Sequence, residues 1–581
     1  MGTIDRVIAA ALRRRGLVLA GVLLLIALGV WSVLGIPIDA FPDVTNIQVE
    51  VLSTTPGLSP PEVERFVTYP VETAMRGLPR LDQIRSVSKA GLSVVTVVFE
   101  DGVDVYFARQ VVLERLIEAR ERVPEGTEMA MGPVSTAMGE IYQYTLAGER
   151  PAGLDETDWL TEVRTVQDWV LAPLLKAVPG VSEINSFGGA IKQYQVVVDP
   201  DRLHAFDLTL ADIGQALSRN NLNAGGNILE HGERQYLVRG VGLLQSVADI
   251  GAVVLDARGG TPILVRDVAE VRAGQAVRQG GAVKDGRGEV VGGVVMMLRG
   301  ANGREVVRAV QERVAEINAS GVLPLGLRLE PYYQRSDIID RAVHTVTEAL
   351  LIGSVLVVLV LYLFLRSFRG AFIVLLALPL SMLFTFVMMR AVGLSANLMS
   401  LGGLAISIGM IIDATIIQVE NVQRHLTEAG AGEARLPVVL RSVLEVRKPS
   451  IFGELIIALT FIPIFALQGI EGKMFLPLAF THVIALLASL ALSLVAVPAF
   501  CHALLGPRPD KPSVLVEGAR RVYLPALRWS LGHAPVLVAA AAALLAGTVL
   551  LIPRLGTEFM PVMDEGALDM DIQFLPGISL P

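Results

Sequence analysis

The sequence predicts an integral membrane α-helical bundle that carries a large exported α/β domain. Hydrophobic residues make up 52% of the chain and charged residues only 18%, whereas soluble domains average about 45–50% and about 25%. The apolar residues gather in long runs, and a polar segment, residues 37–340, separates the first run from the rest. Within that segment, alternating and helical patterns of apolar residues follow one another, which is typical of α/β domains.

Several runs are long enough to cross a bilayer, which takes roughly 18 or more mainly apolar residues. One run opens the chain, five follow the polar segment in close succession, and another lies near the end. We therefore expect seven transmembrane spans, at residues 17–36, 345–365, 370–392, 399–420, 450–468, 476–503 and 534–553.

Basic residues in short loops set the orientation of the spans, because such loops stay in the cytoplasm. Three arginines, residues 13–15, precede the first span, and further arginines lie in the loops after the second and fourth spans. The N-terminus is therefore expected inside, and the segment 37–340 outside. The single cysteine, Cys501, falls in a span, so the exported domain is expected to have no disulfide.

The exported segment is expected to form two βαββαβ units, the ferredoxin-like split βαβ sandwich. The first unit occupies residues 37–135. The second occupies residues 136–340, with strands at 181–187 and 193–199 before the chain returns to it. A stretch rich in Gly and Asn, at about 200–280, interrupts the second unit and is expected to form an inserted docking subdomain.

The remaining boundaries follow from the apolar runs. Residues 1–36 are the cytoplasmic N-terminus and first span, and residues 341–503 hold spans two to six. Residues 504–533 have amphipathic character and are expected along the inner surface. The seventh span, 534–553, then leads to an exported tail, 554–581.

One carboxylate, Asp413, lies in the middle of the expected fourth span, in the apolar run between Leu401 and Glu420. A charged side chain at a helix centre costs about 3 kcal/mol on insertion scales. Such a group is expected to face a protein interior and to bind protons, which is typical of a proton relay. The alternative is an Asp that only hydrogen-bonds a neighbouring helix.

The chain resembles the resistance-nodulation-division (RND) transporters, and in particular their heavy-metal efflux branch of cobalt-zinc-cadmium and copper-silver exporters. The resemblance covers essentially the whole chain. It rests on FPDVTNIQV at 41–49, SPPEVERFVTYPVE at 59–72, FEDGVDVYFARQ at 99–110, GPVSTAMGEIYQY at 132–144, VDPDRLHAF at 198–206, the run from Asn397 to Asn421, and QGIEGKMFLPLAFT at 468–481.

The resemblance implies an inner-membrane pump with a large periplasmic porter domain, two such halves in one polypeptide, and assembly as a homotrimer. It also implies a periplasmic adaptor and an outer-membrane channel as partners. The segment 200–280 is then the expected docking surface. This chain resembles the first half, and 554–581 resembles the start of the second porter region. We therefore expect a truncated sequence or one piece of a split gene.

The resemblance also implies roles for residues of the fourth span. Asp413 matches the Asp that takes up periplasmic protons, and Glu420 lies two turns along the same face. Glu420 has an alternative reading as a helix-end charge paired with Arg424. Ser407 stands where the zinc-cobalt branch usually has a second Asp. Glycines expected to permit close helix packing around the relay are Gly402, Gly403 and Gly409.

The choice of metal depends on ligand softness, because thioethers select Cu(I) and Ag(I) whereas carboxylates suit divalent cations. Ile411 and Gln418 stand where the copper-silver branch has methionines. Glu140 matches an acidic position near the porter site of the divalent branch, and Asp569 and Asp571 accompany it as candidate metal residues. The two aspartates have a plainer reading as solvated strand residues. Together these positions favour Zn, Co, Cd or Ni.

The sequence excludes several other classes of function. It has no Walker-type phosphate loop and no nucleophile elbow or HExxH motif, and its net charge of −8 gives no case for nucleic acid. We expect a proton-coupled cation antiporter that works in a tripartite complex, not an enzyme, with no cofactor besides the transported metal and protons. Alternatives are a Cu(I)/Ag(I) exporter, a pump for organic compounds, and a non-transporting membrane scaffold or fragment.

Overall fold

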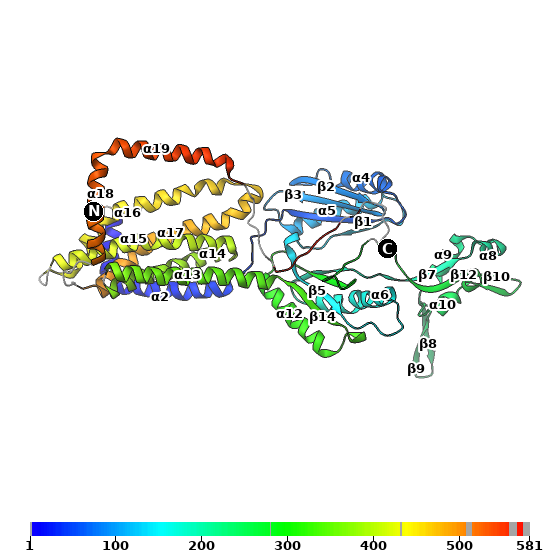
Figure 1. The fold of residues 1–581 in the computed structure, drawn as a ribbon. Coiled ribbons are helices and arrows are strands. Elements are labelled where there is room, and N and C mark those ends of the chain that lie inside the picture. Colours follow the sequence, from blue (N-terminus) through cyan, green and yellow to red (C-terminus); the bar gives the residue numbers. More distant parts are fainter. Residues whose placement is uncertain are drawn as a thin grey trace. The chain divides into compact units, whose positions relative to one another are not determined.

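The computed structural model describes residues 3–278, 280–365, 367–429, 433–506, 514–556, 566–572 and 574 (Figure 1). The chain divides into two compact units. The first unit holds the apolar helices and one sheet, and the second holds another sheet and an inserted subdomain. The first comprises residues 1–141, 297–308 and 334–568, and the second comprises residues 142–296, 309–333 and 569–581.

The sheet of the first unit has the strand order β2-β3-β1-β4. Strand β1 (Ile47–Thr54) pairs antiparallel with β3 (Leu92–Phe99) and with β4 (Glu128–Met131), and β2 (Leu81–Lys89) pairs with β3. In β1 and in most of β3, every second residue is buried, as expected for a sheet with one face on a core. That core lies between the sheet and its helices.

Local capping fixes the helices of this sheet. Helix α3 (Pro60–Val63) continues through η1 (Glu64–Thr68) into α4 (Tyr69–Met75). The backbone N–H and the hydroxyl of Ser59 both donate to Glu62, at 2.9 and 2.6 Å, and these bonds lower the pKa of Glu62. Helix α5 (Val105–Arg120) begins after Asp104, whose carboxylate accepts the N–H groups of the next turn.

The second sheet has the order β14-β5-β13-β6. If the strands of this sheet are numbered along the chain without the insertion, β5 is the first, β6 the second, β13 the third and β14 the fourth. Starting from β6, the order across the sheet is then second, third, first, fourth, as in the first sheet. The crossovers on either side of the insertion are α6 (Glu156–Val166), η3 (Gln167–Leu171) with α7 (Ala172–Lys176), and α12 (Gly303–Ser320). Its strands are β5 (Glu140–Ala147), β6 (Val181–Phe187), β13 (Gly292–Met297) and β14 (Arg328–Gln334).

The insertion begins earlier than the sequence indicated. Strand β7 (Lys192–Val198) was expected in the second βαββαβ unit, but it pairs antiparallel with β12 (Ala269–Gln275), from Lys192 opposite Gln275 to Val198 opposite Ala269. The expectation was wrong because an alternating pattern shows that a segment is extended without showing which strand it pairs with. The inserted subdomain therefore starts at β7.

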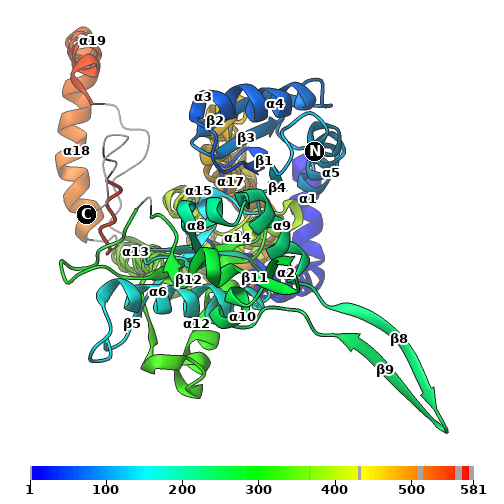
Figure 2. The ribbon, with the colours of Figure 1, turned by 90° about the vertical axis from the view of Figure 1, so that its right-hand side faces the viewer.

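The insertion has its own small core, which includes Ile213, Ile263 and Val265. Its exposed hairpin, β8 (Ala224–His231) paired with β9 (Arg234–Gly240), extends away from the rest of its subdomain (Figure 2). The other elements of the insertion are α8 (Pro200–Ala205), α9 (Leu210–Arg219), α10 (Val247–Gly251), β10 (Val254–Arg258), β11 (Thr261–Leu264) and α11 (Val265–Val268).

Six helical segments in the described part of the chain are long and apolar enough to cross a membrane. They coincide with six of the seven expected spans and confirm that these apolar runs are helical. The expected span 345–365 falls in α13 (Arg335–Leu365), where the apolar stretch found is the shorter Leu351–Val360, so that span stays a prediction. The six are α2 (Arg15–Gly35), α14 (Phe368–Val392), α15 (Leu398–Glu428), Pro449–Ala466, α17 (Gly469–Leu504) and Ala534–Arg554.

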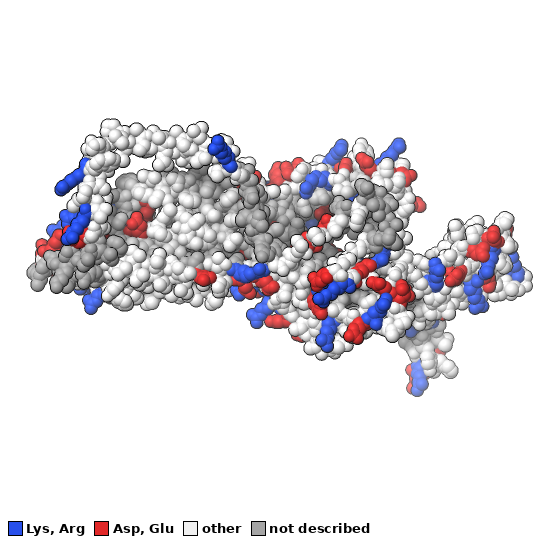
Figure 3. Space-filling model, viewed as in Figure 1, with Lys and Arg blue, Asp and Glu red and all other residues white. Residues whose placement is uncertain are grey.

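The helices form a bundle in which α15 packs against α14, α16 (Arg435–Thr460) and α17. The short helix α1 (Thr3–Arg13) adds Ile8 and Leu12 to the same apolar core. In Figure 3 the face of this helical part is mostly free of charged residues, as expected of a surface that meets lipid. The last helices are α18 (Val514–Gly532) and α19 (Ala534–Leu551).

A buried ion pair holds the start of α13 to the segment that follows α2. The Arg335 guanidinium donates to Oδ1 of Asp39 through Nε and a terminal nitrogen, each at 2.8 Å, and also to the carbonyl of Met138. Arg335 is only 5% exposed. Burial raises the pKa of Asp39 above its usual value, although the Arg335 charge acts to lower it.

We predict that Arg335→Gln destabilises the fold by about 3–5 kcal/mol, because it leaves the Asp39 carboxylate buried without its cation. A folded state with a raised carboxyl pKa binds its proton more tightly than the unfolded chain does, so its stability falls as the pH rises through that pKa. The stability of the variant should therefore fall more steeply from mildly acidic to neutral pH than that of the wild type.

Denaturant unfolding of the detergent-solubilised chain at several pH values measures both effects. The control is the double variant Asp39→Leu with Arg335→Met, which removes both charges and should recover most of the lost stability. Equal pH profiles for the wild type and Arg335→Gln would contradict this assignment.

Candidate functional site

Hydrogen bonds fix the N-terminal end of helix α15. The Asn397 side chain accepts the N–H of Ser400 at 2.9 Å, and the Ser400 hydroxyl accepts the N–H of Asn397 at 2.8 Å. The N–H of Leu398 also donates to the carbonyl of Ala40 at 3.1 Å. This capping box sets the helical phase, and therefore which side chains of α15 face the bundle.

The two sides of α15 differ. Its buried side packs on neighbouring helices and includes Gly403, Ser407, Ile411, Thr415 and Gln418. A second stripe, at intervals of three and four residues, is exposed on the described chain and comprises Ile406, Gly409, Asp413, Ile417 and Glu420. The sequence correctly placed Asp413 and Glu420 on one face of the helix.

Asp413 lies in an open hollow of about 410 Å³ between α15 and α13. Leu356 and Val360 of α13 form one wall, and Met410 and Ile416 belong to the α15 side. The expectation that Asp413 faces a protein interior is not met among the described residues, because α13 covers this face only in part. Apart from Asp413, the residues that line this hollow are apolar or glycine.

Glu420 lies on the same exposed stripe, two turns closer to the C-terminal end of α15. Arg424, which was expected to pair with it, instead donates to the side chain of Asn421 at 2.8 Å. Arg424 also lies 3.8 Å from Glu428 and 3.7 Å from Glu445. The pairing with Arg424 therefore does not account for Glu420, and its secondary relay role stays a prediction.

The three glycines differ in what surrounds them. A Cβ on Gly403 would lie 2.5 Å from the carbonyl oxygen of Leu478 and closer still to the Thr481 hydroxyl, so Gly403 makes the close helix contact that was expected. A Cβ on Gly402 or Gly409 would meet no described atom within 4 Å. Close packing is therefore seen at Gly403 against α17, on the side away from Asp413.

Sequence reasoning missed a polar pair on the buried side of α15. The Ser407 hydroxyl donates to the Gly403 carbonyl at 2.7 Å and lies 2.8 Å from Nδ1 of His482 in α17. Which of these two atoms donates depends on the tautomer of His482. Nε2 of His482 is buried with no partner among the described residues. The sequence signal for this pair was a single histidine, His482, within an apolar run.

A second missed feature is Glu454 in α16, which is only 9% exposed. Arg447, two turns earlier on the same helix, is 1% exposed. The signal was available, because Glu454 is a carboxylate within the expected span 450–468, and such a group is costly there as well.

The candidate metal residues are not brought together as a cluster. Glu140 is the first residue of β5 and is exposed, whereas Asp569 and Asp571 are exposed and lie outside any helix or strand. Glu140 belongs to the first unit and the two aspartates to the second. Within the described ranges, no group of three or more His, Cys, Asp or Glu side chains is arranged to hold a metal ion.

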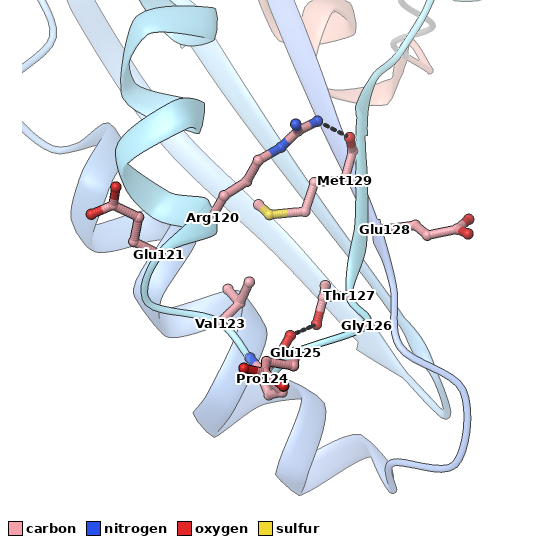
Figure 4. Close-up of a pocket in the computed structure, with 9 residues that line it drawn as sticks. All are labelled: Arg120, Glu121, Val123, Pro124, Glu125, Gly126, Thr127, Glu128 and Met129. Carbon is pink, nitrogen blue, oxygen red and sulfur yellow. Dashed lines mark hydrogen bonds between the residues drawn. The ribbon is translucent and has the colours of Figure 1, made fainter. Parts of the chain in front are cut away.

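The first sheet has a hollow of about 590 Å³ between the end of α5 and β4 (Figure 4). Arg120 closes one side by donating to the Met129 carbonyl at 2.9 Å. The carboxylates of Glu121 and Glu128 point to opposite sides in Figure 4. These acids therefore do not converge on a common point where a cation could bind.

Long apolar helices, one of which carries an acidic residue, together with two sheets of βαββαβ order define the class of multi-pass membrane proteins with α/β domains. The model of the AcrB/AcrD/AcrF family matches residues 7–581, and the chain belongs to that RND family. Several of the proteins it is similar to are named as cation efflux or metal resistance proteins.

The chain is 45% identical over 586 residues to the cation efflux system protein CzcA of Alcaligenes sp. (strain CT14), covering 99% of this chain and 55% of that protein. It is 44% identical to the cobalt-zinc-cadmium resistance protein CzcA of Cupriavidus metallidurans and 39% identical to the cation efflux system protein CusA of Escherichia coli K12, with the same coverage.

The fold is also similar to a solved structure. The crystal structure of a heavy metal efflux pump superimposes with a TM-score of 0.81 at 33% identity, over 96% of this chain and 53% of that one. The chain thus spans about half the length of the proteins it matches.

We predict that Gly403→Ala destabilises the bundle by about 1–3 kcal/mol, because its methyl group would force α15 away from α17. The matched control is Gly402→Ala, one residue earlier on the same helix. It should be neutral or stabilising by up to about 1 kcal/mol, because it gains helix propensity without a clash. Thermal unfolding of the two purified variants in detergent measures the difference, and equal melting temperatures would contradict the close contact.

Proposed function

We propose that this chain is part of a proton-driven RND transporter that exports a heavy-metal cation. The observation that carries the proposal is Asp413, a carboxyl group at mid-span in an otherwise apolar hollow. The heavy-metal relatives support the class of cargo. Because the chain covers about half of each relative, the transport cycle is proposed for the protein that contains this chain.

In this proposal Asp413 takes up a proton from outside and releases it to the cytoplasm. Protonation removes a charge from the hollow beside α13. The free-energy cost of packing apolar side chains of α13 against this face of α15 then falls. Helix α13 begins directly after β14 of the porter sheet. A shift of α13 would therefore be passed to the exported domain along a continuous chain.

We further propose a divalent cation as the cargo. The positions that would hold methionines for a soft ion hold Ile411 and Gln418, and both are buried. The carboxylates proposed along the route, Glu140, Asp569 and Asp571, suit Zn, Co, Cd or Ni better than Cu(I) or Ag(I). Exposed carboxylates also bind weakly enough to release a cation.

The proposed setting is the bacterial inner membrane, with the sheets in the periplasm. A homotrimer, a periplasmic adaptor and an outer-membrane channel complete the route out of the cell. The inserted subdomain between β7 and β12 is the proposed docking surface, and its exposed hairpin β8–β9 supplies unpaired strand edges to a partner.

The test is survival of an efflux-deficient Gram-negative host on a panel of metals. The host expresses the chain alone, the chain with the genomic sequence that follows it, or that longer protein with Asp413→Asn. We expect resistance to zinc, cobalt, nickel or cadmium from the longer protein. The Asn variant should lower the tolerated metal concentration to that of the empty host, because it keeps the shape of Asp413 but cannot ionise.

The matched control is Glu428→Gln at the cytoplasmic end of α15, which also removes one carboxylate and should keep resistance. Resistance to copper or silver instead would overturn the divalent assignment. Resistance that survives Asp413→Asn would overturn the role of Asp413, and no resistance from correctly inserted protein would favour a scaffold.

A further inference from the structure

Helix α16 carries a carboxyl group, Glu454, inside the segment Pro449–Ala466 that is apolar enough to span a membrane. Its oxygen Oε1 accepts the Ser450 hydroxyl at the long distance of 3.4 Å. The other oxygen, Oε2, is buried and has no hydrogen-bond partner among the described residues. A buried carboxylate with an unfilled acceptor is costly, so the group needs either a close cation or a proton.

Arg447 supplies the cation only in part. Its charge acts on Glu454, but no ion pair of 4.0 Å or less joins these two described side chains. Instead, one terminal nitrogen of Arg447 donates to the carbonyl of Leu490 in α17 at 3.4 Å, and Nε is buried without a partner in the described part of the bundle. The ionised form of Glu454 is therefore incompletely compensated.

Helix α15 packs against α16 and carries Asp413, whose charge acts on Glu454 less than that of Arg447 does. From α17 come the Leu490 carbonyl and His482, whose ring lies tilted against that of Phe461, just after the end of α16, with centroids 4.2 Å apart. Helix α1 meets the opposite end of α16. Arg447 is therefore the charged group that matters most to Glu454.

We propose that Glu454 is a second proton-binding residue of the bundle, which holds a proton at Oε2. This oxygen is buried without a partner among the described residues, and Arg447 compensates the ionised form only in part. A proton taken up from the aqueous side forms an O–H bond at Oε2 and removes the buried charge, which is costly in a low-dielectric interior.

This inference rests on the proposed function only for the direction of proton flow. Proton binding by Glu454 is itself a property of the chain and can be measured without transport. The experiment is infrared spectroscopy of the purified chain in lipid nanodiscs as a function of pH. We expect a carboxylic-acid C=O band at neutral pH in the wild type, absent from Glu454→Gln.

The Asp413→Asn variant shows which carboxyl group gives the band. It should leave the band in place, because the burial of Oε2 is a property of Glu454 itself. Glu454→Asp, which keeps a carboxyl group, should restore a band if loss in the Gln variant reflects proton binding and not misfolding. The matched control is Glu471→Gln in the exposed first turn of α17, which should leave the band unchanged.

Two results would overturn the inference. A spectrum that is the same in the wild type and Glu454→Gln would mean that Glu454 stays ionised beside Arg447. A band that disappears in Asp413→Asn and persists in Glu454→Gln would mean that the proton is on Asp413 and not on Glu454. Failure of the metal-survival test would change neither reading, because the infrared band reports the proton and not the cargo.

Discussion

Inside a bilayer no water completes the hydrogen bonds of a polar group, so each polar side chain must find a protein partner or lose its charge. This constraint explains the contact between α15 and α17. Ser407 of α15 meets His482 of α17, the Thr481 hydroxyl donates to the carbonyl of Ser400 at 3.0 Å, and the Ser489 hydroxyl donates to the carbonyl of Ile411 at 3.1 Å. With Gly403 these contacts form a polar, closely packed seam.

The seam leaves the opposite side of α15 free to carry Asp413. A carboxyl group that gains and loses a proton changes its cost of burial by several kcal/mol, because the charged form is disfavoured in low dielectric. Placed within the seam, it would disturb the contact that holds the bundle together. Placed in the hollow beside α13, its charge acts on a helix that lies outside that seam.

Much of this arrangement could be predicted from the sequence because the governing patterns are local. Apolar runs gave six of the spans, and the helical period put Asp413 and Glu420 on one face. Pairing between distant segments could not be predicted in the same way, so β7 was assigned to the wrong sheet. His482 and Glu454 each gave the same kind of signal as Asp413, a polar residue in an apolar run. That each is buried with an unpartnered atom could not be predicted, because it depends on neighbours on other helices.

If Glu454 holds a proton, its protonation state has a mechanical consequence for α16. The ionised carboxylate needs a close cation, and Arg447, whose charge acts on Glu454, also donates to the carbonyl of Leu490 in α17. Loss of the proton would draw Arg447 toward Glu454 and away from that carbonyl. The protonation state would therefore change the contact between α16 and α17, while the seam keeps α15 and α17 together. A proton bound at Glu454 shifts one helix contact without loosening the other, which is what coupling to a moving domain requires.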